Sequence, residues 1–189
     1  MTDAPTGPKA EILAILDEDR IASVATLRPD GWPQATMVGY VHDDLSVYFS
    51  VARASQKAAN IRHDPRVSVA VGHDRQDRIR GLSMAGHAHE VEDVAEIGRL
   101  NALIARRYPE QAVFAPREAQ AVVIRFQPRI VSLIDLTKGP GAPLLFEVVT
   151  ETHVESLDAD RAGHLLHEPA PAGLVRPVPR VAGLDGPPI

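Results

Sequence analysis

The sequence predicts a mainly β fold with flanking α-helices, arranged as a small closed or split barrel of six antiparallel strands. Three β-like segments follow one another between residues 21 and 51, and only short turns separate them, as in a meander. Three more follow at 67–71, 79–91 and 121–136, with helix-like segments between them. A parallel α/β sheet would need helices that alternate regularly with the strands, and the chain lacks that pattern.

The first half of the chain predicts one helix and a three-stranded meander. Residues 9–18 form an amphipathic helix whose apolar residues share one stripe. Residues 21–27 alternate between the two faces of a strand, and residues 28–31 (Arg-Pro-Asp-Gly) have the composition of a turn. Residues 33–41 predict the returning strand. After a second turn, the aromatic and β-branched run at 45–51 predicts the third strand.

The periodicity changes in the second half. Residues 54–62 predict a short helix that ends at the following His-Asp-Pro, because proline restricts the residue before it. The strand at 79–91 contains Gly81 and Gly86, which mark bulges or close approaches of two backbones. Residues 94–108 predict an amphipathic helix, and residues 121–136 are either a strand pair or one strand bent at a proline.

A change in composition places the domain boundary near residue 137. Residues 1–137 contain all six predicted strands, whereas residues 138–189 contain eight of the 16 prolines, interspersed with glycine. Such a composition prevents a regular core element. We therefore expect a Pro-rich C-terminal extension with one edge strand, at 144–154. The rest of this extension is expected to wrap a partner subunit or to remain disordered.

Composition also narrows the classes of function. The 189 residues are 44% hydrophobic, which is ordinary for a globular domain, and the net charge of −5 comes without a basic block, so no nucleic-acid partner is expected. No apolar run is long enough for a membrane span, so no membrane association is expected. The absence of cysteine excludes disulfides and thiolate metal sites. The start of the sequence lacks a signal-peptide pattern. Together with the absence of cysteine, this favours a cytoplasmic protein.

Hydroxyl and cationic side chains gather where the third strand meets the next helix. Ser50 and Arg53 stand at the strand end, and Ser55 and Lys57 open the helix. A helix N-terminus exposes N–H groups and a partial positive charge, and Arg and Lys four residues apart can flank one ligand. The pattern therefore fits a phosphate site. A capping serine beside solvated surface cations explains it as well.

The same segment resembles a signature of the pyridoxamine 5′-phosphate oxidase family. The run S-x-K-x-x-N-I-R-x-D-P-R-V occupies residues 55–67. Upstream, D-G-W-P-Q-A-T-M-V at 30–38 resembles the turn and second strand of that family. Downstream, G-H-A-H-E-V-E-D at 86–93 resembles its G-x-A-x-x-V-x-D strand end. The three motifs stand in the family's order within residues 10–136.

The resemblance implies an FMN-binding split barrel that works as a homodimer, with the flavin between the subunits. The strand that lies along the flavin ring in this family corresponds to Thr36, Met37 and Val38. The phosphate is held in the family by a strand end and by the S-x-K motif, which correspond here to Ser50, Val51, Ser55, Gln56 and Lys57. We add Arg53 from charge geometry. Many members have Arg where Thr36 stands, and the oxidase has a polar ligand of the flavin ring where this chain has Gly81.

The leading hypothesis is an FMN-dependent oxidoreductase that acts on a small-molecule substrate or electron donor. The alternatives are a non-catalytic flavin- or haem-binding stress protein and a deazaflavin-dependent reductase on the same fold. No catalytic side chain is proposed, because no nucleophile triad or carboxylate pair is convincingly placed. No metal site is expected either: His87 and His89 share a strand face without a third ligand nearby in sequence, and the tail histidines (His153, His164, His167) are explained as solvated polar residues.

Oxidation of pyridoxamine 5′-phosphate itself is not expected. In the resembled enzymes the substrate phosphate contacts a Tyr, an Arg and a Ser along the helix after the G-x-A strand, and an Arg-Leu-His-x-Arg run near the C-terminus. Here that helix ends in Arg107 and Tyr108 with no serine in step. Near the C-terminus, Arg176 and Arg180 are separated by prolines and lack the histidine.

Overall fold

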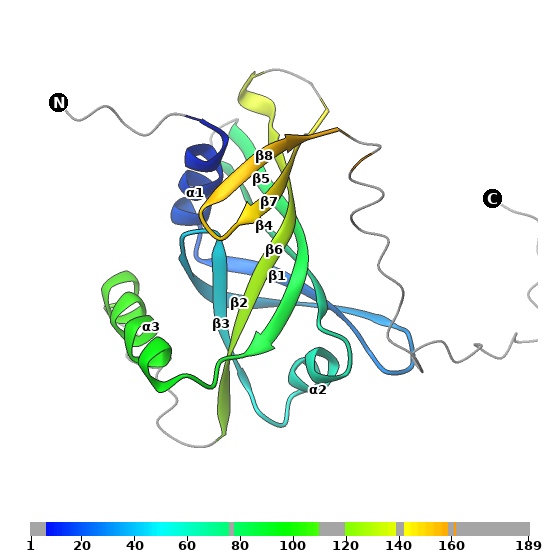
Figure 1. Ribbon diagram of the computed structural model, residues 1–189, viewed down its shortest axis with the longest axis vertical. Helices are drawn as coiled ribbons and strands as arrows, with labels where there is room; N and C mark the ends of the chain where they lie inside the picture. The colour runs from blue at the N-terminus through cyan, green and yellow to red at the C-terminus, as the bar shows by residue number, and fades with distance from the viewer. Residues whose placement is uncertain (1–6, 76–77, 110–119, 139–141, 159–160, 162–189) are drawn as a thin grey trace, which may run out of the picture.

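The computed structural model describes residues 7–75, 78–109, 120–138, 142–158 and 161. Their strands form one antiparallel sheet in the order β3-β2-β1-β4-β5-β6-β7-β8, and β3 also pairs with β6 (Figure 1). This additional pairing closes β1 to β6 into the predicted six-stranded antiparallel barrel. The elements are α1 (Pro8–Glu18), β1 (Ile21–Leu27), β2 (Pro33–Asp43), β3 (Ser46–Ala52), α2 (Gln56–His63), β4 (Arg66–Arg75), β5 (Arg78–Glu90), α3 (Val94–Arg107), β6 (Ala121–Asp135), a 3-10 turn (Leu136–Lys138), β7 (Leu144–Thr150) and β8 (His153–Leu157).

β6 is the strand that closes the barrel. It pairs with β5 along almost its whole length, with β3 through residues 121–126, and with β7 through residues 130–133. The segment is thus one long strand rather than a strand pair. Pro128 stands between the stretches that pair with β3 and β7, where its missing N–H interrupts neither pairing.

The core lies inside the barrel and comes from alternate residues of the strands. In β1, Ala22 and Val24 are fully buried. Ile21, on the other face of the same strand, is 48% exposed. α1 closes one end of the barrel with three fully buried side chains, which confirms the predicted apolar stripe: Ile12, Ile15 and Leu16. None of the described helices is long and apolar enough to cross a membrane.

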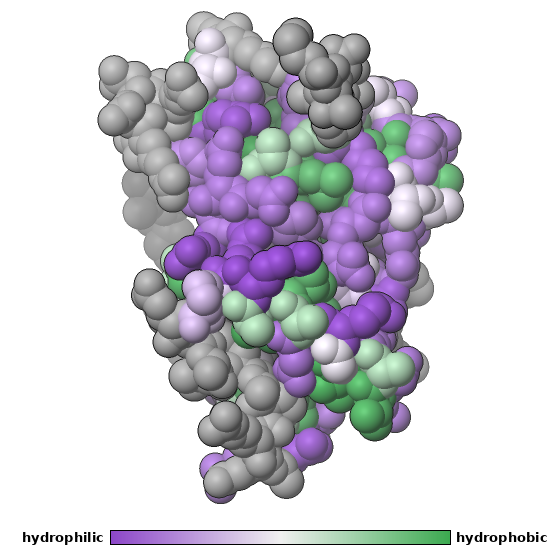
Figure 2. Space-filling model, turned by 90° about the vertical axis from the view of Figure 1, so that its left-hand side faces the viewer, coloured by the Kyte–Doolittle hydropathy of each residue, from purple (hydrophilic) through white to green (hydrophobic). Residues whose placement is uncertain are grey.

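α3 packs outside the barrel, against β2, β3 and β6. Its Leu100 is 1% exposed and contacts a second apolar cluster that includes Val41, Tyr48 and Val123. Leu103 also packs against this cluster, as the predicted amphipathic helix requires. Hydrophilic residues predominate on the side of the molecule that carries α1 and α3, with only small hydrophobic patches between them (Figure 2).

The end of α3 is joined to the corner between α1 and β1. The Tyr40 hydroxyl donates to the Leu16 carbonyl oxygen at 2.8 Å, and the Tyr108 hydroxyl donates to the Tyr40 carbonyl oxygen at 2.6 Å. Arg107 donates to the Leu16 carbonyl oxygen at 2.7 Å and also to that of Asp19. The bonds to Leu16 and Asp19 satisfy carbonyl groups that the end of a helix leaves without an intrahelical donor.

The C-terminal extension differs from the prediction in one respect. Where one edge strand is predicted, the structure has two, β7 and β8, joined as a hairpin that continues the sheet beyond β6. Phe146 of β7 is 4% exposed and belongs to the main core, so the hairpin adds to the barrel. Alternation in the short β8 is too weak in the sequence to reveal it. The expected tail at 162–189 lies outside the described residues.

Gly86 forms the predicted bulge in β5. The register between β5 and β6 shifts between Ala85 and Gly86, and a Cβ atom at Gly86 would overlap the carbonyl oxygen of Gln127. Only glycine therefore permits the two backbones to approach this closely.

We predict that Gly86→Ala lowers the free energy of unfolding by about 3 kcal/mol, because the clash is with backbone and cannot be relieved by a side-chain rotation. The matched control is Gly98→Ala in α3, where no atom beyond its chain neighbours and the backbone of its own helix lies within 4 Å of the new Cβ. That substitution should stabilise the protein by about 0.5–1 kcal/mol, because alanine favours a helix more than glycine does. Urea unfolding measures both, and equal effects would refute the assignment of Gly86.

Candidate functional site

β2 and β3 separate at one end of the barrel. Their pairing joins residues 40–43 to residues 46–49 and stops there, so residues 33–39 pair only with β1. β3 continues along β6 instead, through Ala52. One backbone edge of β2 therefore has no strand partner over residues 33–39. α2 lies beside this open edge, below the β1–β2 hairpin in Figure 1.

Asn60 anchors α2 to the β1–β2 hairpin. It is fully buried, and its Nδ2 donates to Thr26 Oγ1 at 2.9 Å and to Gln34 Oε1 at 3.1 Å. Its Oδ1 accepts from Gln56 Nε2 at 2.8 Å. These bonds fix the helix against two strands. Sequence reasoning missed this role, although the position of Asn60 one turn after Lys57 in the S-x-K-x-x-N motif is a signal for it.

The start of α2 is capped by Ser55. Its Oγ accepts from the backbone N–H of Ala58 at 3.2 Å, so the capping explanation of this serine is correct. The first N–H groups of any α-helix lack an intrahelical acceptor and carry a partial positive charge. This end of α2 therefore favours an anion.

Lys57 is 7% exposed, although its side chain ends in an ammonium group. Its Nζ donates to the Thr36 carbonyl oxygen at 3.3 Å and lies 5.8 Å from the centre of the Phe49 ring. No carboxylate pairs with it among the described residues, and burial alone lowers its pKa to about 8. Burying a cation without an opposite charge is costly, so the site is suited to an anionic ligand.

The hydrogen bond from Lys57 to Thr36 brings together two of the predicted groups, the flavin-ring strand and the S-x-K motif. Thr36 and Met37 are exposed, Met37 to 67%, while Val38 packs against the core. Gln56 is exposed at the helix start. These residues line the open edge and the helix end beside it.

Ser50 and Val51 face opposite sides of β3, because successive side chains of a strand alternate. Val51 lies on the side of Phe49 and therefore of Lys57, and it packs against the core. Ser50 lies on the side that α3 covers, where its hydroxyl donates to a backbone carbonyl of β6 at 3.3 Å. The Ser50 hydroxyl is thus directed away from Lys57, which alternation along the strand could have indicated.

Arg53 has a partner of its own. Its side chain is 55% exposed, and its Nη1 lies 3.9 Å from Glu90 Oε2. The other oxygen of Glu90 accepts from Arg62 Nε at 2.6 Å. A contact between Arg53 and a phosphate stays a prediction, and it would compete with Glu90.

The later part of the S-x-K motif has a structural role. The Asp64 carboxylate is fully buried and accepts from Arg66 Nη2 at 2.6 Å and from Arg66 Nε at 3.0 Å. This arginine holds the pKa of Asp64 below its usual value, through hydrogen bonds first. The pair fixes the turn between α2 and β4, so D-P-R in the motif serves the fold.

The histidines form no metal site in the part of the chain that the structure describes. His87 and His89 share a face of β5, as expected, with ring centres 6.5 Å apart. No group of three His, Asp or Glu side chains among the described residues could hold a metal ion. His153 is exposed on β8, and His164 and His167 lie outside the described residues.

Comparison with known proteins identifies the family of this barrel. The model of the pyridoxamine 5′-phosphate oxidase family matches residues 8–135, more than half of the chain. The chain belongs to the pyridoxamine 5′-phosphate oxidase family. The matched region begins with α1 and ends with β6, so it contains the closed barrel, α2 and the open edge of β2.

The proteins that this chain resembles differ from one another. General stress protein 26 of Bacillus subtilis is 30% identical over 66 residues, which are 35% of this chain and 46% of that protein. The chain thus spans about half the length of this curated relative. A haem-binding protein of Mycobacterium smegmatis has a TM-score of 0.63 at 19% identity and covers 85% of this chain and 62% of its own.

A FAD-binding protein of Mesorhizobium loti also resembles the pyridoxamine 5′-phosphate oxidase-like barrel of this chain. Its TM-score is 0.56 at 22% identity, and the likeness covers 68% of this chain and 95% of the other. At such identities both structural likenesses concern the fold alone.

We predict that the free energy of unfolding rises with pH above about pH 8, because of Lys57. Burial lowers its pKa in the folded protein to about 8, from an ordinary value of 10.5. Between these values the unfolded chain binds more protons than the folded one, so deprotonation favours folding. Burial raises the pKa of Tyr48 to about 12 and also raises that of Tyr40, so neither tyrosine ionises in this interval.

Urea unfolding between about pH 8 and pH 9.5 measures this dependence. Lys57→Met is the control variant, because it keeps the length of the side chain and removes the titrating group. The difference in the free energy of unfolding between wild type and variant should become smaller as the pH rises. A difference that does not change with pH would mean that the ammonium group is not desolvated.

Proposed function

We propose that the chain binds FMN, with the phosphate at the start of α2 and the flavin ring along the open edge of β2. The observation that carries this proposal is the buried ammonium group of Lys57, which pairs with no carboxylate among the residues described. A phosphate at this position would accept from Lys57 and from the first N–H groups of α2. It would thereby supply the negative charge that the site lacks.

The open edge of β2 suits the polar part of a flavin ring. Over residues 33–39 the backbone presents donors and acceptors on the side that no strand occupies. Met37 offers an exposed apolar contact next to them. Membership of the family and the FAD-binding relative of the same fold support a flavin as the ligand class.

We propose further that the protein is an oxidoreductase whose flavin carries the hydride or electron chemistry, while the chain binds, orients and shields it. Pyridoxamine 5′-phosphate is not the proposed substrate. Tyr108 is 7% exposed, and its hydroxyl bonds to the backbone of β2. Arg107 binds the carbonyl groups at the end of α1. Arg107 and Tyr108 therefore stabilise the fold, and their bonds to the backbone leave them no role in holding a substrate phosphate.

The outer face of four strands supports a homodimer. Two rows of paired residues cross β2, β1, β4 and β5, and all their side chains are small or apolar: Met37, Ser23, Ala70 and Ser83 in one row, Ala35, Ala25, Ser68 and Ala85 in the next. Directly paired residues share a face of the sheet, and both rows face away from the core. An even face without charges packs closely on another sheet, so we propose a second copy of the chain as its partner.

For the FMN site, we predict that Lys57→Met weakens FMN binding by about 1.5–3 kcal/mol, the range of a hydrogen bond to a charged group. Riboflavin, which lacks the phosphate, should bind wild type and variant with similar affinity. The same substitution should raise the stability of the flavin-free protein at neutral pH, because it removes a buried charge that has no counter-charge. Fluorescence titration with both flavins and urea unfolding measure these effects.

If Lys57→Met weakens FMN binding but stabilises the flavin-free protein, general damage to the fold is excluded. Equal losses for FMN and riboflavin would refute the phosphate assignment. The absorption spectrum of the purified protein separates the proposal from its alternatives, since flavin bands, a Soret band and the spectrum of a deazaflavin differ. A Soret band alone would favour a haem-binding protein.

For the dimer, we predict a mass in solution near twice 20.4 kDa, measured by sedimentation equilibrium. Ala70→Glu places a charge at the middle of the even face and should shift the protein toward the monomer. Val94→Glu is the matched control, because Val94 is 81% exposed on α3 and should leave the mass unchanged. A wild-type monomer that holds FMN firmly would refute the dimer.

A further inference from the structure

The side chain of Trp32 lies outside the core, at the tip of the β1–β2 hairpin. It is the only tryptophan of the chain, and it is 71% exposed. Its backbone is held at both polar groups: the Arg28 N–H donates to the Trp32 carbonyl oxygen at 3.0 Å, and the Trp32 N–H donates to the Asp30 carboxylate at 3.2 Å. The Arg28 side chain also donates twice to Asp30. These bonds fix the backbone from which an exposed aromatic ring projects.

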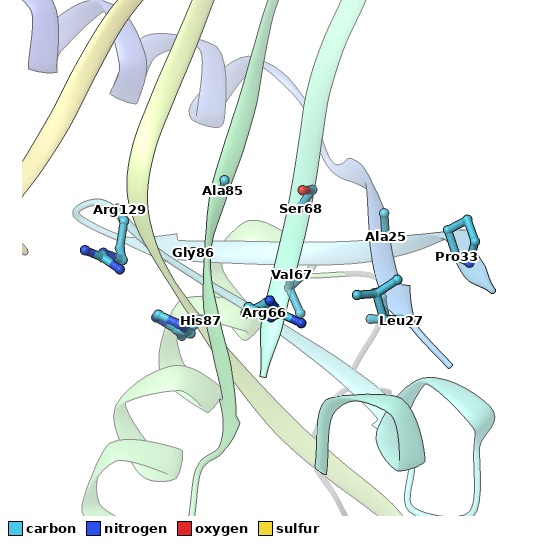
Figure 3. Close-up of a pocket in the computed structure, with 11 residues that line it drawn as sticks. Ala25, Leu27, Pro33, Arg66, Val67, Ser68, Ala85, Gly86, His87 and Arg129 are labelled. Carbon is cyan, nitrogen blue, oxygen red and sulfur yellow. The ribbon is translucent and has the colours of Figure 1, made fainter. Parts of the chain in front are cut away.

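Trp32 lies on the side of β2 that α2 contacts. Figure 3 shows Pro33 and Ala25 among the residues that line the outer face of the sheet. Trp32 precedes Pro33, and its bond to Arg28 continues the β1–β2 ladder by one pair. Because successive side chains of a strand alternate, Trp32 takes the opposite side from Pro33. It shares that side with Gln34, which α2 contacts through a hydrogen bond.

The Gln34 amide is oriented by this contact. Asn60 Oδ1 accepts from Gln56 Nε2 at 2.8 Å, which leaves Asn60 Nδ2 to donate to Gln34 Oε1 at 3.1 Å. The Nε2 of Gln34 is therefore the end of the amide that points away from Asn60. It has two N–H groups, and neither has an acceptor among the described residues.

Three groups thus follow one another along this side of β2: the ring of Trp32, the amide of Gln34, and the Lys57 ammonium at the Thr36 carbonyl. From Trp32 to Thr36 the strand extends by about 13 Å, at about 3.3 Å per residue. The FMN proposed above has its phosphate at Lys57 and its ring farther along the open edge. It leaves Trp32 and Gln34 without a contact.

We propose that the site continues past this phosphate and binds a flavin dinucleotide, whose second phosphate lies at Gln34 and whose base stacks on Trp32. A dinucleotide carries its flavin, two phosphates, ribose and base in this order. A base offers a flat face to an aromatic side chain, and an amide N–H donates to phosphate oxygens. The oriented amide and the fixed backbone of Trp32 lower the entropy cost of binding. This proposal rests on the proposed function, because the dinucleotide contains the FMN half.

Calorimetric titration of the flavin-free protein compares FAD with FMN. FAD should bind about 10-fold more tightly, the effect of stacking one base on an aromatic side chain. Trp32→Ala should remove this preference and leave the FMN affinity unchanged. The control variant is Val94→Ala, which shortens an 81% exposed side chain of α3 and should change neither affinity. Gln34→Glu keeps an acceptor for Asn60 but replaces the two donors with a negative charge, so it should weaken FAD binding more than FMN binding.

The fluorescence of the only tryptophan reports directly on the base. ADP carries a base and two phosphates without a flavin, so it should quench the emission of Trp32. Ribose 5-phosphate, which lacks the base, should not quench it. Lys57→Met should weaken quenching by ADP, because the phosphates then lose their cation.

The outcomes separate the two proposals. If FMN binds and FAD binds no more tightly, the dinucleotide is refuted while the FMN site stands. Equal losses of both flavins in Trp32→Ala, or unchanged emission with ADP, would have the same meaning. If neither flavin binds, the proposed function is overturned and the dinucleotide with it.

Discussion

The structure depends on how the neighbouring strands share the two edges of β6. β5 occupies the first edge along nearly all of β6, while β3 and β7 share the second, at residues 121–126 and 130–133. Because β3 must reach β6 to close the barrel, it leaves β2 after Phe49. The opening between β2 and β3 is therefore a result of barrel closure. α2 lies beside this opening, and the candidate site exists because of it.

The buried polar side chains of α2 and of the turn after it are of two kinds. Some are satisfied by hydrogen bonds within the fold, and the exception, Lys57, marks the candidate site. Asn60 and Asp64 are fully buried, and each is satisfied by hydrogen bonds to neighbouring elements. Such groups stabilise one arrangement of the chain and are explained by it. Lys57 is almost as buried but bonds to one neutral carbonyl group. Folding alone does not account for a cation in this position, which is why we propose an anionic ligand there.

Local patterns predicted most of the fold, and long-range pairing explains what they missed. The alternation of residues 21–27 and the Arg-Pro-Asp-Gly turn act between near neighbours, so the β1–β2 hairpin was predictable. The second strand of the C-terminal hairpin has five residues and depends on β7 for its pairing. At the site, the motif indicated Lys57, and alternation along β3 could have placed the Ser50 hydroxyl on the opposite face, but only the fold gives Arg53 its contact with Glu90.

The junction of α3 with the corner between α1 and β1 has a consequence for the order in which the chain acquires its structure. The Tyr108 hydroxyl and the Arg20 carbonyl oxygen, 3.0 Å apart, are separated by 88 positions in sequence. Closing so long a loop costs entropy before the contact repays it. On the ribosome, the donors that Arg107 and Tyr108 supply to this corner are therefore absent until more than half of the polypeptide has emerged. The N-terminal helix is made early but becomes firmly seated late.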